Sequence, residues 1–244
     1  MHGTFRFFLA TLVMLSHLWW GGPVHIGVAS VAVFYMLAGY VVTGLCHRHF
    51  PPGRLRAFYA ERLLRICPLY FFFLLTVSLW VFATGFGSPV TGIYKAFAHL
   101  TIIPLNYAMF GHTGVVRGFA ILPTSWSLAV ELQAYAILPL IIRSLRAKWI
   151  VGVFSLLVFS AASFDLVDSG SWGYRLLPGV FFLFLAGSAM YKSIKSPESA
   201  DSFDRKFPAI CWGWSFILLL VLILMRKTLS TFPTPVMMGL LLGM

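Results

Sequence analysis

Two ionisable residues lie inside long apolar stretches, where a charge is costly and is usually kept for function. His17 follows the apolar run 7–15, and Glu131 ends the segment 126–131 (WSLAVE) inside a longer apolar run. Imidazole has an ordinary pKa of about 6.5 and is the best general base for a hydroxyl at neutral pH. A carboxylate can orient or charge such an imidazole. The structural alternatives are a histidine hydrogen-bonded between helices and a glutamate paired with an arginine.

Three arginines are spaced so that they could act with these residues. Arg6 precedes His17 by eleven positions, and eleven steps of about 100° bring both side chains to one helix face, roughly 16 Å apart. Arg62 and Arg65 are three positions apart, so they are neighbours on a helix and could hold phosphate oxygens. The alternatives are that Arg6 is a topology signal and that Arg62 and Arg65 meet lipid headgroups.

The elements that position these residues are predicted to be membrane helices. Only 10% of the 244 residues are charged and 59% are hydrophobic, far from the roughly 25% charged usage of soluble domains. The net charge of +11 comes from basic residues in short loops between apolar runs, which favours orientation in a lipid bilayer over nucleic-acid binding. We therefore expect an all-α, polytopic membrane helix bundle, as one domain over residues 1–244.

Apolar runs long enough to span a bilayer, about 20 residues, recur along the chain and predict eight or nine transmembrane helices. The fourth is short and is followed by Gly111, Gly114 and Gly118, so it is expected to be re-entrant or to lie at the interface. The expected segments are 7–24, 27–46, 66–84, 96–110, 119–142, 149–164, 176–191, 207–225 and 229–244.

Loop charges predict the orientation. The loop 47–65 carries five arginines against one acid, which places it and the N-terminus in the cytoplasm of a multi-pass protein of the cell membrane. Arg143, Arg146 and Lys148 form a second basic cluster that also favours the cytoplasm.

Cysteines 46, 67 and 211 lie far apart without the spacing of metal ligands, so neither a metal site nor a disulfide is expected.

Together, these motifs resemble the acyltransferase family 3 membrane proteins, bacterial enzymes that acylate cell-surface and exported glycans. Arg6 and His17 match the family's R-x10-H pattern, segment 27–40 is similar to its second span, and Arg62 and Arg65 match R-x-x-R before Pro68-Leu69-Tyr70. Trp126, Ser127 and Glu131 match W-S-L-x-x-E. The matching motifs cover residues 1 to about 143.

The resemblance implies an O-acyltransferase that moves an acyl group, most simply acetyl, from acyl-CoA to a carbohydrate or lipid-linked glycan hydroxyl, with no bound cofactor. It makes His17 and Glu131 the catalytic residues, and Arg6, Arg62, Arg65, Trp126 and Ser127 contacts for acyl-CoA or the other substrate. Two departures stand out: Ala38 replaces the family's usual serine, and Met244 falls about one or two helices short of the family's ten.

Two other classes of function remain open at this point. A histidine and a glutamate within the membrane could form the proton relay of a coupled transporter, although no inverted repeat is visible. The chain could also be an inactive structural subunit. Release of a thiol from acyl-CoA separates the enzyme from both.

Overall fold

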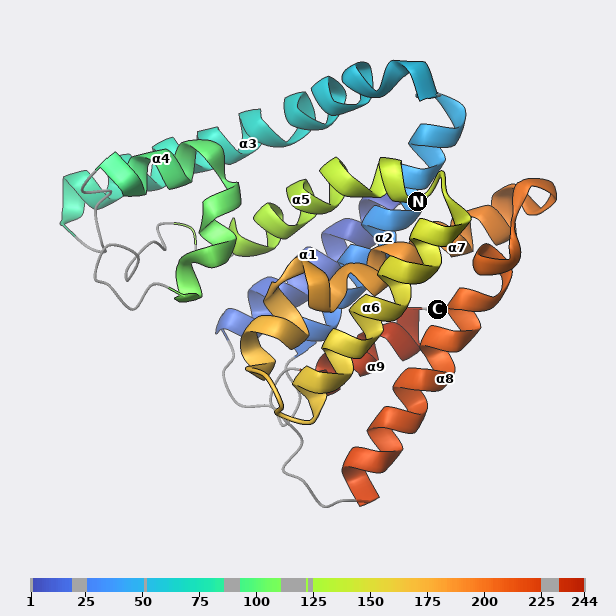
Figure 1. The fold of residues 1–244 in the computed structure, drawn as a ribbon. Helices are drawn as coiled ribbons and strands as arrows, with labels where there is room; N and C mark the ends of the chain where they lie inside the picture. The colour runs from blue at the N-terminus through green and yellow to red at the C-terminus, as the bar shows by residue number, and fades with distance from the viewer. Residues whose placement is uncertain are drawn as a thin grey trace. The chain divides into compact units, whose positions relative to one another are not determined.

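The computed structural model describes residues 2–18, 26–50, 52–85, 93–110, 122, 125–224 and 233–243. Within these ranges the chain forms nine α-helices, and no strand is assigned (Figure 1). The α-helices are α1 His2–Leu18, α2 Ile26–Arg48, α3 Leu55–Thr84, α4 Ile93–Thr101, α5 Ser125–Ile141, α6 Leu145–Ser163, α7 Leu177–Lys195, α8 Ser202–Leu224 and α9 Pro233–Gly243. The shorter helices are η1 Pro52–Arg54, η2 Ile103–Phe110, η3 Ser171–Arg175 and η4 Pro197–Ser199.

Length and composition make five of the described helical segments suitable to cross a membrane: α2, α3, α6, residues 171–195 and α8. Three shorter apolar helices, in α1, α5 and α9, accompany them. The prediction of an all-α, polytopic membrane helix bundle is confirmed.

The contacts within the chain divide it into two compact units. The first unit comprises residues 1–48 and 137–244, and the second unit comprises residues 49–136. That the chain acts as one domain stays a prediction.

Helix α7 is the centre of the first unit and packs against α2, α6 and α8. Its residues from Val180 to Ala189 are all buried, as expected for a helix that is apolar on every side. Thr43 of α2 donates a hydrogen bond to Ser188 of α7, with 2.7 Å between the two hydroxyl oxygens. Hydroxyl pairs of this kind hold helices together where water is absent.

Two glycines set how closely α2 and α7 approach. A Cβ atom added to Gly39 would lie 1.9 Å from the carbonyl oxygen of Phe184, and one added to Gly187 would lie 1.8 Å from that of Met36. Because backbone stands at both points, a side chain at either position would force the helices apart. Small residues let membrane helices gain packing energy through such close backbone contact.

The second unit contains α3, α4, η2 and α5 as far as Ala136. Its apolar core consists of Tyr70 from α3, Ala98, Ile102 and Leu105 from the α4–η2 stretch, and Ala129 from α5. Most of α3 is exposed in the protein alone; only 11% of its most apolar 18-residue window is buried. This large apolar surface is compatible with contact with lipid.

Two predicted boundaries differ from the structure. The third span was expected over 66–84, but α3 already begins at Leu55, since residues 55–65 contain good helix formers and no helix breaker. The fourth expected span, 96–110, is divided between α4 and η2 at Ile102. Nine residues of α-helix rise only about 14 Å, which is too short to cross a bilayer. The glycines at 111, 114 and 118 lie outside the described residues.

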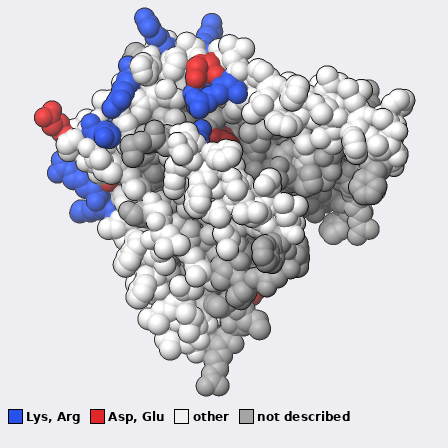
Figure 2. Space-filling view, turned by 180° about the vertical axis from the view of Figure 1, so that it is seen from behind, with Lys and Arg blue, Asp and Glu red and all other residues white. Residues whose placement is uncertain are grey.

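Basic residues gather at one end of the first unit. The Arg48 guanidinium lies 6.0 Å from the centre of the Tyr191 ring, Ser193 donates to the backbone oxygen of Asp204, and Asp204 accepts from Lys148. These contacts join the end of α2 to the end of α7 and the starts of α8 and α6, so both predicted basic clusters contribute to this end. The opposite end of α6 is followed by Asp165 and Asp168. In Figure 2 the visible Lys and Arg side chains, drawn in blue, gather toward the upper left of the view.

Candidate functional site

Arg6 and His17 both lie on α1, as predicted. Arg6 is half-buried, and its Nε atom is buried without a hydrogen-bond partner in the described part of the chain. A buried guanidinium N–H without an acceptor is costly. This atom is therefore suited to receive an oxygen of an anionic or carbonyl-bearing ligand.

The environment of His17 fixes how its ring can act. The side chain is exposed within the first unit, and Nδ1 lies 2.8 Å from the backbone oxygen of Val13. Because a carbonyl oxygen only accepts, this contact is a hydrogen bond only when Nδ1 carries the proton. In the neutral ring Nε2 then holds the lone pair, which is the form required of a general base.

Arg62 and Arg65, predicted as a pair, have different surroundings on α3. The Arg62 side chain is only 3% exposed and forms two hydrogen bonds to the adjacent Glu61, at 2.5 and 2.6 Å. Arg65 is exposed, and it forms no ion pair with a described residue. The charge of Arg62 is thus largely met by the protein, whereas Arg65 is available to an external anion.

Trp126 and Ser127 lie in the first turn of α5, both half-buried, and Glu131 follows in the second turn. Glu131 accepts a hydrogen bond from the hydroxyl of Tyr135, one turn further along the same helix. The ring of Tyr135 in turn lies 5.9 Å from the Arg62 guanidinium. Tyr135 therefore connects the R-x-x-R motif to the glutamate of W-S-L-x-x-E.

This connection was not predicted from the sequence. The i, i+4 spacing of Glu131 and Tyr135 was available as a signal, because such residues are neighbours on a helix. The pairing of Tyr135 with Arg62 depends on how α3 packs against α5, which no local pattern reveals.

The predicted site residues fall in both units. Arg6 and His17 belong to the first unit, and Arg62, Arg65, Trp126, Ser127 and Glu131 belong to the second. Within the second unit, Arg62 and Glu131 are brought together through Tyr135. The pairing of His17 with Glu131 stays a prediction.

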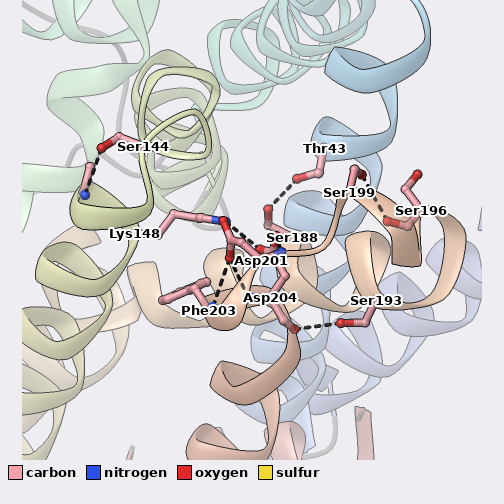
Figure 3. Close-up of polar contacts among 11 residues, drawn as sticks. Thr43, Ser144, Lys148, Ser188, Ser193, Ser196, Ser199, Asp201, Phe203 and Asp204 are labelled. Atoms are coloured by element: carbon pink, nitrogen blue, oxygen red, sulfur yellow. Dashed lines mark hydrogen bonds and ion pairs between the residues drawn. The ribbon is translucent and has the colours of Figure 1, made fainter.

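Lys148 has a different role from the one its basic neighbours suggested. It was grouped with Arg143 and Arg146 as a basic cluster that favours the cytoplasm; its side chain is only 3% exposed and donates to Asp201 at 2.5 Å and to Asp204 at 2.8 Å. Figure 3 shows Lys148 reaching from α6 to these two carboxylates at the start of α8. Burial of a lysine requires such partners, so its charge is used within the fold.

Asp201 also shapes the start of α8. Its Oδ1 accepts hydrogen bonds from the backbone N–H groups of Phe203 and Asp204, as a helix-capping residue does. Burial alone would raise the pKa of Asp201, but the bonds from Lys148 and these backbone groups favour the charged form and hold the pKa below its ordinary value.

Comparison with known proteins agrees with the motif pattern. The model of the acyltransferase 3 family, described as an acyltransferase domain, matches residues 4–244. The chain belongs to this family. With several apolar helices long enough to cross a membrane, it is a multi-pass membrane protein of the acyltransferase 3 family.

Two relatives are similar to this chain over part of their length. An uncharacterized protein of Aquifex aeolicus (strain VF5) is 30% identical over 126 residues, covering 50% of this chain and 54% of the relative. Nodulation protein 10 of Rhizobium leguminosarum bv. viciae is 29% identical over 169 residues, covering 59% of this chain and 44% of the relative. The chain thus spans about half the length of these curated relatives. No solved structure matches it significantly.

Proposed function

We propose that this acyltransferase moves an acyl group, most simply acetyl, from acyl-CoA to a hydroxyl of a cell-surface or exported carbohydrate. The observation that carries the proposal is the pair on α1: an arginine with a buried, unbonded Nε and a histidine whose Nδ1 contact leaves Nε2 as the basic atom. A cation and a base on one helix are what transfer of an acyl group to a hydroxyl requires.

In the proposed reaction, Nε2 of His17 takes the proton of the acceptor hydroxyl. The hydroxyl oxygen attacks the thioester carbonyl and forms a C–O bond, and the carbonyl becomes an oxyanion. Collapse of this species breaks the C–S bond, and the CoA thiolate takes the proton from His17. Glu131, held by Tyr135, is proposed to favour the protonated imidazole.

The arginines are proposed to bind the polyanionic donor. Arg65 is exposed without an ion pair among the described residues, so we assign it the main phosphate contact, with Arg6 as a supporting cation. Arg62 is already bonded to Glu61, so its contribution to phosphate binding should be smaller. Trp126 and Ser127, at the start of α5, are proposed to contact acyl-CoA or the acceptor.

The basic end of the first unit supports the proposed orientation in the cell membrane. Arg48, Arg143 and Arg146 are exposed at helix ends, and such residues favour the cytoplasmic side. A cysteine introduced at Gly53 of the intervening loop should react with a permeant thiol reagent in intact cells and resist an impermeant one. Efficient labelling by the impermeant reagent would reverse the orientation.

The function is tested with purified full-length protein, acetyl-CoA and candidate carbohydrate acceptors. The expected result is acceptor-dependent release of the CoA thiol, accompanied by an acylated sugar detected by mass spectrometry. Proton-coupled solute uptake by proteoliposomes without any thiol release would instead indicate a transporter and would reject the proposal.

A further inference from the structure

Asn106 is a buried polar residue that the proposed reaction does not yet use. It lies in η2 and is 0% exposed, yet neither its Oδ1 nor its Nδ2 has a hydrogen-bond partner in the described part of the chain. An amide buried without hydrogen bonds destabilises a fold, and nearly all buried polar groups avoid this state. The acceptor Oδ1 and the donor Nδ2 are therefore both available to a group outside the described part of the chain.

The position of Asn106 is fixed by its two neighbours. Leu105 belongs to the core that includes Ala129 of α5, and Tyr107 donates a hydrogen bond from its hydroxyl to Oε1 of Gln133, also in α5, at 2.8 Å. Thus η2 is held to α5 on either side of Asn106. This places Asn106 beside the helix that carries the W-S-L-x-x-E motif.

The backbone that leads to Asn106 is strained. Ile102 joins α4 to η2 with φ of 64°, a left-handed conformation that is rare for a β-branched residue. The eight residues of η2 form a 3-10 helix, which is longer than the three or four residues usual for this helix type. Strained backbone persists where the surroundings enforce it, and such sites cluster at ligand-binding positions.

The preceding residues show what enforces this conformation. His99, buried in the last turns of α4, is hydrogen-bonded to the hydroxyl of Tyr70 in α3, with Nδ1 3.2 Å from the oxygen. Ile102 itself is only 2% exposed and packs in the same core. The α4–η2 stretch is therefore anchored on both sides of the strained residue.

We propose that the Asn106 amide binds the pantetheine arm of the acyl donor. The inference rests on the proposed function. A phosphate group or a thioester carbonyl would offer an acceptor to Nδ2 but no donor to Oδ1. A pantetheine arm is an extended, mainly apolar chain with secondary amides, so it supplies both a C=O and an N–H within apolar surroundings.

The same arm occurs in CoA and on acyl carrier proteins, so the chemistry recognised is common to both donors. Because Asn106 is 0% exposed, the arm can reach it only if part of the surrounding protein moves. The short hydrogen-bonded turns of η2 and the joint at Ile102 are the places where the backbone can absorb such a movement.

The chain contains one asparagine and one glutamine, which makes a matched control available. Gln133 lies in the same unit, but both ends of its amide are bonded: Oε1 to Tyr107 and Nε2 to the backbone oxygen of Ala129 at 3.2 Å. Asn106→Leu therefore removes a side-chain amide that has no hydrogen bond among the described residues. Gln133→Leu removes one that is hydrogen-bonded at both ends.

The test measures binding of CoA and of adenosine 3′,5′-bisphosphate, which lacks the arm, to full-length protein in detergent. Asn106→Leu should weaken CoA binding about tenfold, the effect of losing one or two hydrogen bonds, and leave binding of the bisphosphate unchanged. It should also raise the thermal midpoint of the free protein, because an unmet buried amide has been removed. Gln133→Leu should lower the midpoint, because it breaks the Tyr107 bond that holds η2 to α5, and should weaken CoA binding less than Asn106→Leu does. Stabilisation of the parent by a pantetheine-bearing carrier protein, but not by CoA, would identify the carrier protein as the source of the arm.

Several results would overturn the inference. Unchanged CoA affinity in Asn106→Leu, with parent-like thiol release, would remove Asn106 from the donor site while leaving the proposed function intact. Asn106→Ala, which adds no branched side chain, must show the same loss of CoA affinity; if its midpoint falls and its affinity does not change, the amide has a structural role. A parent protein that binds no pantetheine compound and releases no thiol would reject both the proposed function and this inference.

Discussion

Lys148 and Arg6 are two cations of the first unit with opposite surroundings. Lys148 is 3% exposed and has two carboxylates within 2.8 Å, whereas Arg6 has a buried Nε that no described residue bonds. A charge whose partners are all supplied by the fold stabilises that fold. The unbonded Nε of Arg6 is instead open to the substrate contact proposed for it.

The second unit repeats this contrast with neutral amides. Gln133 is bonded at both ends of its amide, and Asn106 at neither. Burial of a polar group alone therefore does not mark a functional residue in this protein. The completeness of its hydrogen bonding is the more useful criterion.

The largest effect is expected at His17. Replacing His17 with alanine should reduce turnover per folded molecule by about 10²- to 10⁴-fold, the usual contribution of general acid–base catalysis. His17→Gln should not restore activity, because an amide cannot titrate near neutral pH. Thiol release at saturating acetyl-CoA, normalised to folded protein, measures the effect.

Thr11→Val is the matched control on α1, since it also removes a side-chain bond to a backbone oxygen one turn earlier, that of Phe7. It should keep parent-like turnover. Near-parent activity in His17→Gln would make His17 a structural residue and would contradict the catalytic assignment.

The next effect is expected on stability at Lys148. Lys148→Met leaves Asp204, 2% exposed, as a buried charge without its cation, and breaking such a pair costs about 3–5 kcal/mol. Turnover per folded molecule should not change. The free energy of unfolding in detergent tests the first expectation, and thiol release tests the second.

Replacing all three charged groups together, as Lys148→Met with Asp201→Asn and Asp204→Asn, should recover part of the lost stability because no charge remains buried alone. If the triple variant is less stable than Lys148→Met, the carboxylates have a role beyond pairing with the lysine.

Much of this architecture could be predicted from the sequence because its signals are local. Apolar runs identified the helices of α2, α6 and α8, and the order of the motifs placed Arg6, His17, Arg62 and Glu131 on helices. The expected span 66–84 lies within α3, which begins earlier, at Leu55, because hydropathy marks the expected membrane boundary and not the point where a helix begins.

The partners of individual side chains could not be predicted in the same way. The burial of Lys148 depends on acids more than fifty residues later, and nothing near Lys148 distinguishes it from Arg143 or Arg146. The unmet amide of Asn106 likewise follows from the packing of η2 on α5. Both are tertiary features for which a sequence pattern offers no local signal.

The two arginines of R-x-x-R allow a charge that is paired within the protein, that of Arg62, to be compared with an exposed charge on the same helix, that of Arg65. Arg65→Ala should raise the KM for acyl-CoA about tenfold, since a charge-assisted hydrogen bond contributes about 1.5–3 kcal/mol. Arg62→Ala should raise this KM less and lower the stability more, because it leaves Glu61 without its partner. Arg65→Lys should rescue poorly if a planar guanidinium is needed. Equal KM changes for the two alanine variants would show that Arg62 leaves Glu61 to bind the donor.

The smallest effect is expected at Asp201, the more exposed of the two acids that bind Lys148. Its side chain is 35% exposed, and asparagine caps a helix about as well as aspartate, so Asp201→Asn should cost less than about 1 kcal/mol near neutral pH. The pKa of Asp201 is lowered in the folded protein, so its contribution is present above the ordinary aspartate value of about 4 and is lost as the pH falls through the folded value. The stability difference between the parent and Asp201→Asn should therefore narrow below about pH 4.

Glu198→Gln, which replaces an exposed acid in the neighbouring η4, is the control and should show a smaller pH-dependent difference. A difference for Asp201→Asn that is constant across this range would show that Asp201 acts on α8 through its shape and cap alone, and that Asp204 is the carboxylate that holds the Lys148 charge.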